Sequence, residues 1–123
     1  MTRTVASGLD LWLPPFVLMA VIFVLSAQPD LNSGLGVIDL VGRKIIHAGE
    51  YALLCFLWWR ALRTVVEPRP ALALAFALAV GYACTDELHQ RSVHGRHGTP
   101  VDVAIDAVGA AAAAFGVARR RRA

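Results

Sequence analysis

The sequence predicts an all-α protein, specifically an integral membrane four-helix bundle with both termini in the cytoplasm. Three observations favour this class: a high apolar content, the gathering of apolar residues into four long runs, and an uneven distribution of basic residues. Of the 123 residues, 57% are hydrophobic and 17% are charged, and the mean hydropathy is +0.56. A soluble domain of this length has too little interior to enclose that much apolar surface.

Each of the four apolar runs approaches the length of a membrane span. A helix needs about 20 mostly apolar residues to cross the hydrocarbon core of a bilayer. The runs cover about residues 10–27, 45–63, 71–87 and 101–118. Four such spans use nearly the whole chain, so we expect residues 1–123 to form one multi-pass domain of the cell (inner, cytoplasmic) membrane.

The first run contains two prolines and ends in small residues. Pro14-Pro15 is tolerated in the first turn or at a kink of a membrane helix, so it requires no functional explanation. Ser26-Ala27 at the end of the run raises the question of a cleaved signal peptide. Leu25 occupies the third position before that cut and does not suit the small-residue pattern, so we expect the first span to be retained.

The second run, residues 45–63, begins among polar residues. Lys44, His47 and Tyr51 are separated by three and four residues, so they lie on one face of a helix. Glu50 follows His47 by three residues and lies close to the same stripe. Charged groups at the edge of hydrocarbon are costly and usually have a partner and a function. We therefore expect this face to belong to a polar site.

The third and fourth runs carry polar residues at their adjoining ends. Asp86, His89 and Gln90 repeat the i, i+3, i+4 spacing at the end of the third run. Asp102 and Asp106 lie four residues apart at the start of the fourth. Gly109 and a series of alanines continue that helix, and small residues let helix backbones approach closely. These spacings place each polar group on one helical face.

The basic residues set the expected orientation. Eight of the 12 lie at the N-terminus, around the second connection and in the tail, namely Arg3, Arg60, Arg63, Arg69 and Arg119 to Arg122. Positive charge stays on the cytoplasmic side, so both termini and the second connection are expected inside. Trp12, Trp58 and Trp59 then lie at the inner interface, where indole rings prefer to sit.

On this topology the polar residues collect at the outer ends of the spans. All four histidines and seven of the nine acidic residues lie on that side. Glu50 and Asp106 sit roughly one or two turns below the outer interface, at about 1.5 Å per residue. A carboxylate at that depth is protonated or paired. A simple membrane anchor has no need of this asymmetry, so we predict an outward-facing polar site where the second, third and fourth spans meet.

Other classes of protein are disfavoured. The net charge of +3 rests on an arginine run that follows an apolar helix, and that run holds no aromatic residue for base stacking, so nucleic acid is not an expected partner. Cys55 and Cys84 lie inside predicted spans, with neither metal spacing nor a disulfide framework, and we interpret them as packing residues.

These residues resemble the VanZ-like family of small bacterial membrane proteins. The matching elements are Ser26 with Pro29, Lys44-x-x-His47-x-x-x-Tyr51-x-x-Leu54, Tyr82-x-x-x-Asp86-Glu87-x-His89-Gln90, Gly95-Arg96, and Asp102 with Asp106 and Gly109. The resemblance covers about residues 20–115, with two departures: the family commonly has a second serine where Ala27 stands and asparagine in place of Asp106. It implies a bacterial cell-envelope protein and a role in antibiotic resistance of the teicoplanin (glycopeptide) type, without alteration of the usual peptidoglycan target.

The first functional hypothesis is an enzyme that acts on a lipid-linked or phosphate-bearing envelope substrate. Lys44 and Arg96 suit phosphate binding, and His47 or His89 suits acid–base or nucleophilic chemistry with Asp86 orienting the ring. We assign catalytic roles to His47, Asp86, Glu87, His89 and Asp102, and substrate binding to Lys44, Tyr51, Gln90, Arg96 and Asp106. Phosphoester or acyl hydrolysis or transfer all stay open, because no catalytic motif selects among them.

Three alternatives to the enzyme hypothesis are also considered. A non-catalytic module could bind or transport a lipid headgroup or another envelope component, and transport by so small a chain requires a homo-oligomer. The carboxylates and His89 suit magnesium, manganese or zinc, but their spacing matches no known cage, so no metal or cofactor is assigned. The same polar residues also fit a structural ion-pair network that holds helix ends together.

Overall fold

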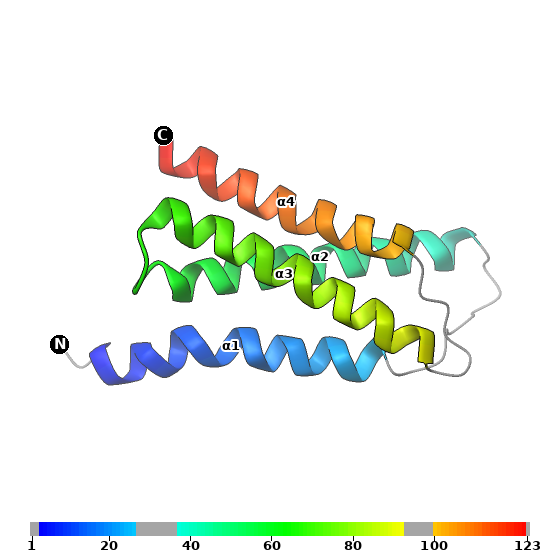
Figure 1. The fold of residues 1–123 in the computed structure, drawn as a ribbon, viewed down its shortest axis with the longest axis horizontal. Coiled ribbons are helices and arrows are strands. Elements are labelled where there is room, and N and C mark those ends of the chain that lie inside the picture. Colours follow the sequence, from blue (N-terminus) through cyan, green and yellow to red (C-terminus); the bar gives the residue numbers. More distant parts are fainter. Residues whose placement is uncertain (1–2, 27–36, 93–99, 123) are drawn as a thin grey trace.

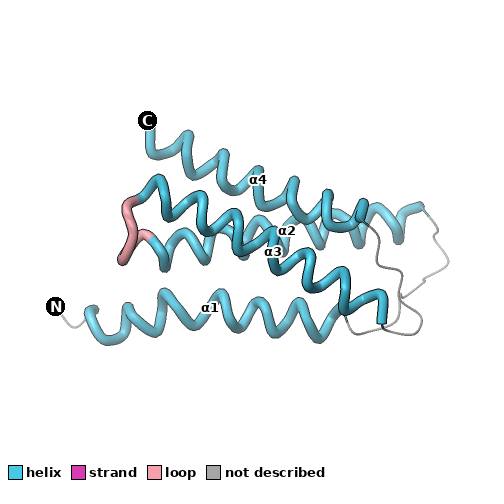
Figure 2. The backbone as a smooth tube through the Cα atoms, in the orientation of Figure 1, coloured by secondary structure: helices cyan, strands magenta, loops and turns pink. Residues whose placement is uncertain are grey.

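The protein is an all-helical bundle of four antiparallel helices. The structure, a computed structural model, describes residues 3–26, 37–92 and 100–122. Its helices are α1 (Arg3–Ser26), α2 (Val37–Leu62), α3 (Pro68–Ser92) and α4 (Pro100–Arg122). Successive helices run in opposite directions (Figure 1), and the described loop is the short turn between α2 and α3 (Figure 2). The predicted all-α class and the number of helices are confirmed.

The two ends of the bundle hold different parts of the chain. The terminal end holds the start of α1, the α2–α3 turn and the end of α4 (Figure 1). The polar end lies opposite and holds the end of α1, the start of α2, the end of α3 and the start of α4. The predicted pairing of helix ends follows from this alternation, because each helix returns along its predecessor.

The helices extend beyond the predicted spans. α2 begins at Val37 rather than near residue 45, and α3 continues to Ser92 rather than ending near residue 87. The expected bounds followed apolar content, whereas helix formation depends on backbone propensity, which Lys, Arg, Glu and Gln also satisfy. The polar residues of both helices therefore lie on regular helix and not in loops.

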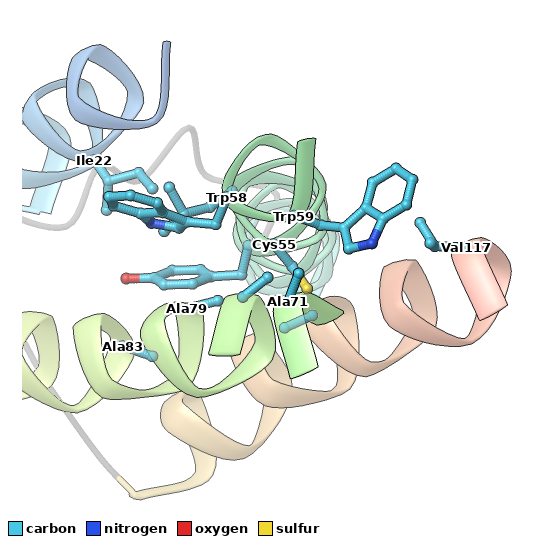
Figure 3. Packing of buried hydrophobic residues seen from close by; sticks show 12 residues of the cluster. Ile22, Cys55, Trp58, Trp59, Ala71, Ala79, Ala83 and Val117 are labelled. Atoms are coloured by element: carbon cyan, nitrogen blue, oxygen red, sulfur yellow. The ribbon is translucent and has the colours of Figure 1, made fainter. Parts of the chain in front are cut away.

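The core rests on α3 packing closely against α2. Alanines recur at every fourth residue of α3 and are fully buried at Ala71, Ala75, Ala79 and Ala83. They belong to one buried cluster with larger side chains of α2, including Leu54. Figure 3 shows Cys55 and Trp58 of that cluster together with Ala71, Ala79 and Ala83. A stripe of small residues lets two helix backbones approach closely, so α3 supplies a shallow surface and α2 fills it.

The outside of the bundle is strongly apolar. α1 alone exposes eight large apolar side chains, Leu9, Leu13, Phe16, Val17, Val21, Phe23, Val24 and Leu25. Contiguous apolar surface on this scale is unusual on a soluble protein. Two helices are long and apolar enough to cross a membrane, α1 over Gly8–Leu25 and α3 over Pro68–His89. Among the described residues, no stretch of α2 or α4 meets the same criterion.

α1 is attached by aromatic rings and by two side-chain bonds to its backbone. Trp12 and Phe16 meet Trp58 edge-on, with ring centroids 6.4 Å and 5.2 Å away. Tyr82 of α3 donates a hydrogen bond of 2.6 Å to the carbonyl of Met19. In the described part of the chain α1 contacts α2 and α3 but not α4.

The other side-chain bond to the backbone of α1 involves the carbonyl of Asp10, and it has a cause in the sequence. Pro14 has no N–H, so the carbonyl of Asp10, four residues earlier, loses its helical donor. The Arg60 guanidinium of α2 donates a hydrogen bond to that carbonyl. The proline therefore creates an acceptor on the side of α1, and α2 supplies the donor.

Candidate functional site

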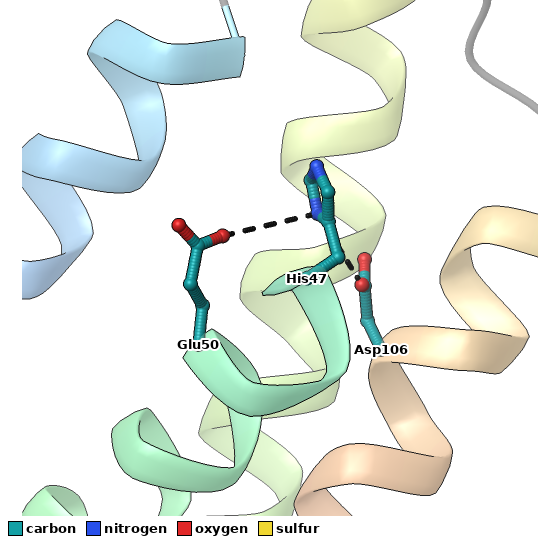
Figure 4. Close-up of polar contacts among 3 residues, drawn as sticks. All are labelled: His47, Glu50 and Asp106. Atoms are coloured by element: carbon teal, nitrogen blue, oxygen red, sulfur yellow. Dashed lines mark ion pairs between the residues drawn. The ribbon is translucent and has the colours of Figure 1, made fainter. Parts of the chain in front are cut away.

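The polar end brings titratable side chains of α2 and α4 into contact. Nδ1 of His47 lies 3.5 Å from Oδ1 of Asp106 on α4 and 4.0 Å from Oε1 of Glu50 on its own helix (Figure 4). Asp106 is only 3% exposed, whereas the His47 side chain is 24% exposed. A buried carboxylate requires a partner, and the imidazole supplies one while keeping access to the outside.

A close helix crossing directly beneath this pair holds it in place. A Cβ added at Gly109 would lie 2.7 Å and 2.8 Å from the carbonyl carbon and Cα of Ala48. Real Cβ atoms essentially never approach backbone so closely, so α2 and α4 meet here only because residue 109 has no side chain. Ala48 follows His47, and Gly109 comes one turn after Asp106, so the crossing sets the distance across the pair.

Two aromatic residues line the site from α2 and α3. Tyr51 is fully buried, and its hydroxyl has no hydrogen-bond partner among the described residues. Its ring centroid lies 6.4 Å from that of Tyr82. Asp86, also buried, acts electrostatically on both Tyr51 and His47. Residues of α2, α3 and α4 therefore share one polar environment.

Two of the predicted catalytic residues on α3, Glu87 and His89, make contacts away from the His47–Asp106 pair. Glu87 pairs with Arg91, one turn later, at 2.8 Å between Oε1 and Nη2, and the Arg91 side chain is 52% exposed. The ring of His89 stacks on Phe23 of α1, with centroids 4.3 Å apart and planes inclined by 20°. His89 therefore faces α1, while His47 faces α4.

The remaining predicted residues divide by position. Lys44 is half-buried on α2, one turn before His47. Gln90 lies in α3 and Asp102 in α4, both at the polar end, and the structure does not describe their side chains. Arg96 lies outside the described residues. No group of three His, Cys, Asp or Glu side chains within the described ranges is arranged to hold a metal ion.

Three residues of this region were assigned no role in the predicted site, although Glu50 was already expected beside its helical face. Glu50 lies one turn from His47, and Tyr82 lies one turn from Asp86, so helical spacing alone carried a signal for both. Phe23 carried none. Its contact with His89 joins α1 to α3, and an apolar side chain in an apolar run gives no indication of its neighbour on another helix.

The fold and the site define a class, a small four-helix protein with apolar outer faces and a polar site at one end of the bundle. The sequence-family model described as VanZ/LLP1 matches residues 3–119. The chain therefore belongs to the VanZ-like family, and the predicted resemblance is confirmed. No curated protein and no solved structure matches the chain.

Proposed function

We propose that the chain is a multi-pass protein of the bacterial inner membrane, with all four helices inserted and both termini in the cytoplasm. The two helices able to span a membrane, the exposed apolar faces and membership of the VanZ-like family support membrane insertion. Exposed Arg63, Arg69, Arg119 and Arg120 lie at the terminal end, as expected for the cytoplasmic side. The polar end then opens to the outer leaflet.

The proposed activity is acid–base catalysis on a lipid-linked or phosphate-bearing envelope substrate. The observation that carries it is the contact between His47 and Asp106. Nδ1 of the imidazole faces the carboxylates, and the other ring nitrogen, Nε2, points away from them (Figure 4). A carboxylate that orients a histidine through one nitrogen leaves the other to exchange a proton with substrate. Asp106, rather than Asp86, is the residue that orients His47.

The physiological role that we propose is a contribution to glycopeptide resistance of the teicoplanin type. An enzyme that modifies a lipid-borne envelope component at the outer leaflet changes the surface that such an antibiotic meets. This role needs no change in the usual peptidoglycan target. It rests on membership of the VanZ-like family together with the outward orientation proposed above.

The test uses a strain that lacks the chromosomal copy and carries His47→Gln, Asp106→Asn or, as a control, Cys84→Ser. Cys84 is exposed on α3 and takes no part in the site. Membrane abundance, teicoplanin susceptibility and the mass-spectrometric profile of envelope lipids are measured together. We expect the first two variants to keep at least half of wild-type abundance and to change both susceptibility and one lipid species. Wild-type lipid profiles in both variants would refute catalysis by this pair.

A second candidate function is binding of a headgroup without chemistry. The buried Tyr51 hydroxyl favours it, because a buried polar group without a protein partner is satisfied when a ligand supplies one. Tyr51→Phe separates this role from a structural one. The Tyr51 hydroxyl has no hydrogen-bond partner in the described residues, so its loss should not lower stability. A changed susceptibility at normal abundance then indicates contact with a ligand. An unchanged lipid profile in the same cells then favours binding over catalysis.

A further inference from the structure

The Tyr51 hydroxyl is a buried polar group of the site that the described residues do not satisfy. Tyr51 has no exposed surface, and its hydroxyl makes no hydrogen bond within the part of the chain that the structure describes. The residue follows His47 by one turn of α2, and its ring centroid lies 6.4 Å from that of Tyr82 on α3. Buried polar groups are nearly always hydrogen-bonded, so this hydroxyl indicates the place of a ligand atom.

Carboxylates from three helices act on this hydroxyl. The charged groups with the strongest effect on it are, in decreasing order, Asp86 of α3, Asp106 of α4 and Glu50 of α2. Asp86 and Asp106 are each only 3% exposed, so water screens their charges weakly. His47 contacts Asp106 at 3.5 Å and offsets at most one of the three negative charges. A ligand atom beside the hydroxyl therefore meets a negative potential from all three helices.

This potential determines which kind of ligand atom the hydroxyl can bind. A phenolic hydroxyl has one hydrogen to donate and lone pairs to accept. The carboxylates attract its hydrogen, so the lone pairs are left to accept a hydrogen bond from a donor. A donor that carries positive charge is favoured over a neutral one, because the carboxylates attract it as well. A primary ammonium group meets both demands, since it combines positive charge with three N–H donors.

From this arrangement we infer that the polar site binds the primary ammonium group of a lipid headgroup, with the Tyr51 hydroxyl accepting a hydrogen bond and the carboxylates of Asp86 and Asp106 beside it. An ethanolamine phospholipid is the simplest such ligand, and it bears the phosphate of the proposed substrate. His47 lies one turn nearer the polar end than Tyr51 does, so the headgroup atoms that follow the ammonium lie near the imidazole. The inference rests on the proposed function, because it names the substrate class of the same site.

The experiment measures lipid binding by native mass spectrometry of the full chain purified in detergent. Dioleoylphosphatidylethanolamine and dioleoylphosphatidylcholine are titrated separately. The two lipids share their acyl chains and net charge, but the quaternary ammonium of the choline headgroup has no N–H. We expect the wild type to bind the ethanolamine lipid about tenfold more tightly, because hydrogen bonds from charged donors are stronger than neutral ones. Equal binding of the two lipids overturns the inference.

A soluble probe separates a lipid from a free amine. Phosphoethanolamine carries the same ammonium and phosphate without acyl chains, so it should bind more weakly than the lipid. Binding as tight as that of the lipid would overturn the assignment to a lipid headgroup.

Tyr51→Phe tests the hydrogen-bond acceptor. Loss of the hydroxyl should weaken binding of the ethanolamine lipid about tenfold and leave binding of the choline lipid unchanged, because the ring is kept. The hydroxyl has no partner in the described residues, so its loss should not lower stability. Wild-type binding of the ethanolamine lipid by this variant would contradict the role given to the hydroxyl.

Asp86→Asn tests the negative charge, and Glu67→Gln is its matched control. Both changes replace one carboxylate by an amide, but Glu67 is exposed in the turn between α2 and α3, at the opposite end of the bundle. We expect Asp86→Asn to weaken binding of the ethanolamine lipid about fivefold and Glu67→Gln to leave it unchanged. Equal effects of the two variants count against the inference. Should Asp86→Asn fail to accumulate, Tyr51→Phe decides the outcome.

Failure of this inference is distinguishable from failure of the proposed function. A preference of the wild type for the ethanolamine lipid, together with an unchanged lipid profile in His47→Gln cells, removes acid–base catalysis and leaves the ammonium site. Equal binding of the two lipids, together with an altered profile in those cells, removes the ammonium site and leaves catalysis.

Discussion

The contact between α2 and α4 and the contact of α1 with the rest of the bundle are built from different kinds of residue. α2 and α4 meet backbone to backbone at Ala48 and Gly109, with a charge pair set beside the crossing. α1 meets its neighbours largely through bulky side chains, such as the rings of Trp12 and Phe16 against Trp58 and the buried Ile22. Small residues make the first distance rigid, whereas long side chains allow the second to adjust. The site geometry is therefore built on the rigid contact.

The two interfaces also differ in how they use hydrogen bonds. At α1, side chains of α2 and α3 bond to backbone carbonyls, at Asp10 and Met19. Between α2 and α4 the polar contact joins two titratable side chains, His47 and Asp106. A bond to a backbone carbonyl does not depend on the side chain of the residue that carries it, so such bonds suit attachment. A contact between titratable groups responds to a ligand or to protonation, so it suits a site.

The largest expected effect comes from a substitution that forces α2 and α4 apart at their crossing. Gly109→Ala forces α4 away from Ala48 and should lower the free energy of unfolding by about 1–3 kcal/mol, as overpacking does elsewhere. Gly116→Ala on the same helix is the control, since an added Cβ there meets no atom within 4 Å. Unfolding of both variants is followed in mixed detergent micelles. Equal stability of the two variants would show that α2 and α4 are not in rigid contact at this crossing.

A double-mutant cycle sharpens the role of the charge pair. His47→Ala and Asp106→Ala, alone and combined, should show a coupling energy of about 1.5 kcal/mol in the same unfolding assay, because the two side chains are in direct contact. The cycle between His47 and Glu50 should give a smaller coupling, because their separation is 4.0 Å rather than 3.5 Å and both lie on one helix. The reverse order would contradict the assignment of Asp106 as the orienting carboxylate.

The smallest effect is expected at α1. Tyr82→Phe removes the hydrogen bond to Met19 and should lower the free energy of unfolding by about 1 kcal/mol. Tyr51→Phe makes the same chemical change at a hydroxyl without a hydrogen-bond partner in the described residues, so it should not lower the free energy of unfolding. Cleavage of α1 by limited proteolysis should also become faster in Tyr82→Phe alone. Identical behaviour of the two tyrosine variants would mean that the bond to Met19 adds nothing to the attachment.

Much of this architecture was predictable from the chain. Four apolar runs predicted four helices, and alternation of direction placed residues such as His47, Asp86 and Asp106 at one end. The bounds were less accurate at Val37 and Ser92, because hydropathy reports apolar content and not backbone propensity. The pairing of His89 with Phe23 was not predictable, since spacing along one helix does not specify the helix that faces it.

The sequence by itself determined the helical class, the order and direction of the helices, the family, and the gathering of polar residues at one end. These follow from local periodicity and connectivity, which a single chain carries in full. Only the tertiary structure decided that His47 meets Asp106 and that the ring of His89 stacks on Phe23. Those contacts depend on the rotation and spacing of whole helices, which many weak packing contacts set together.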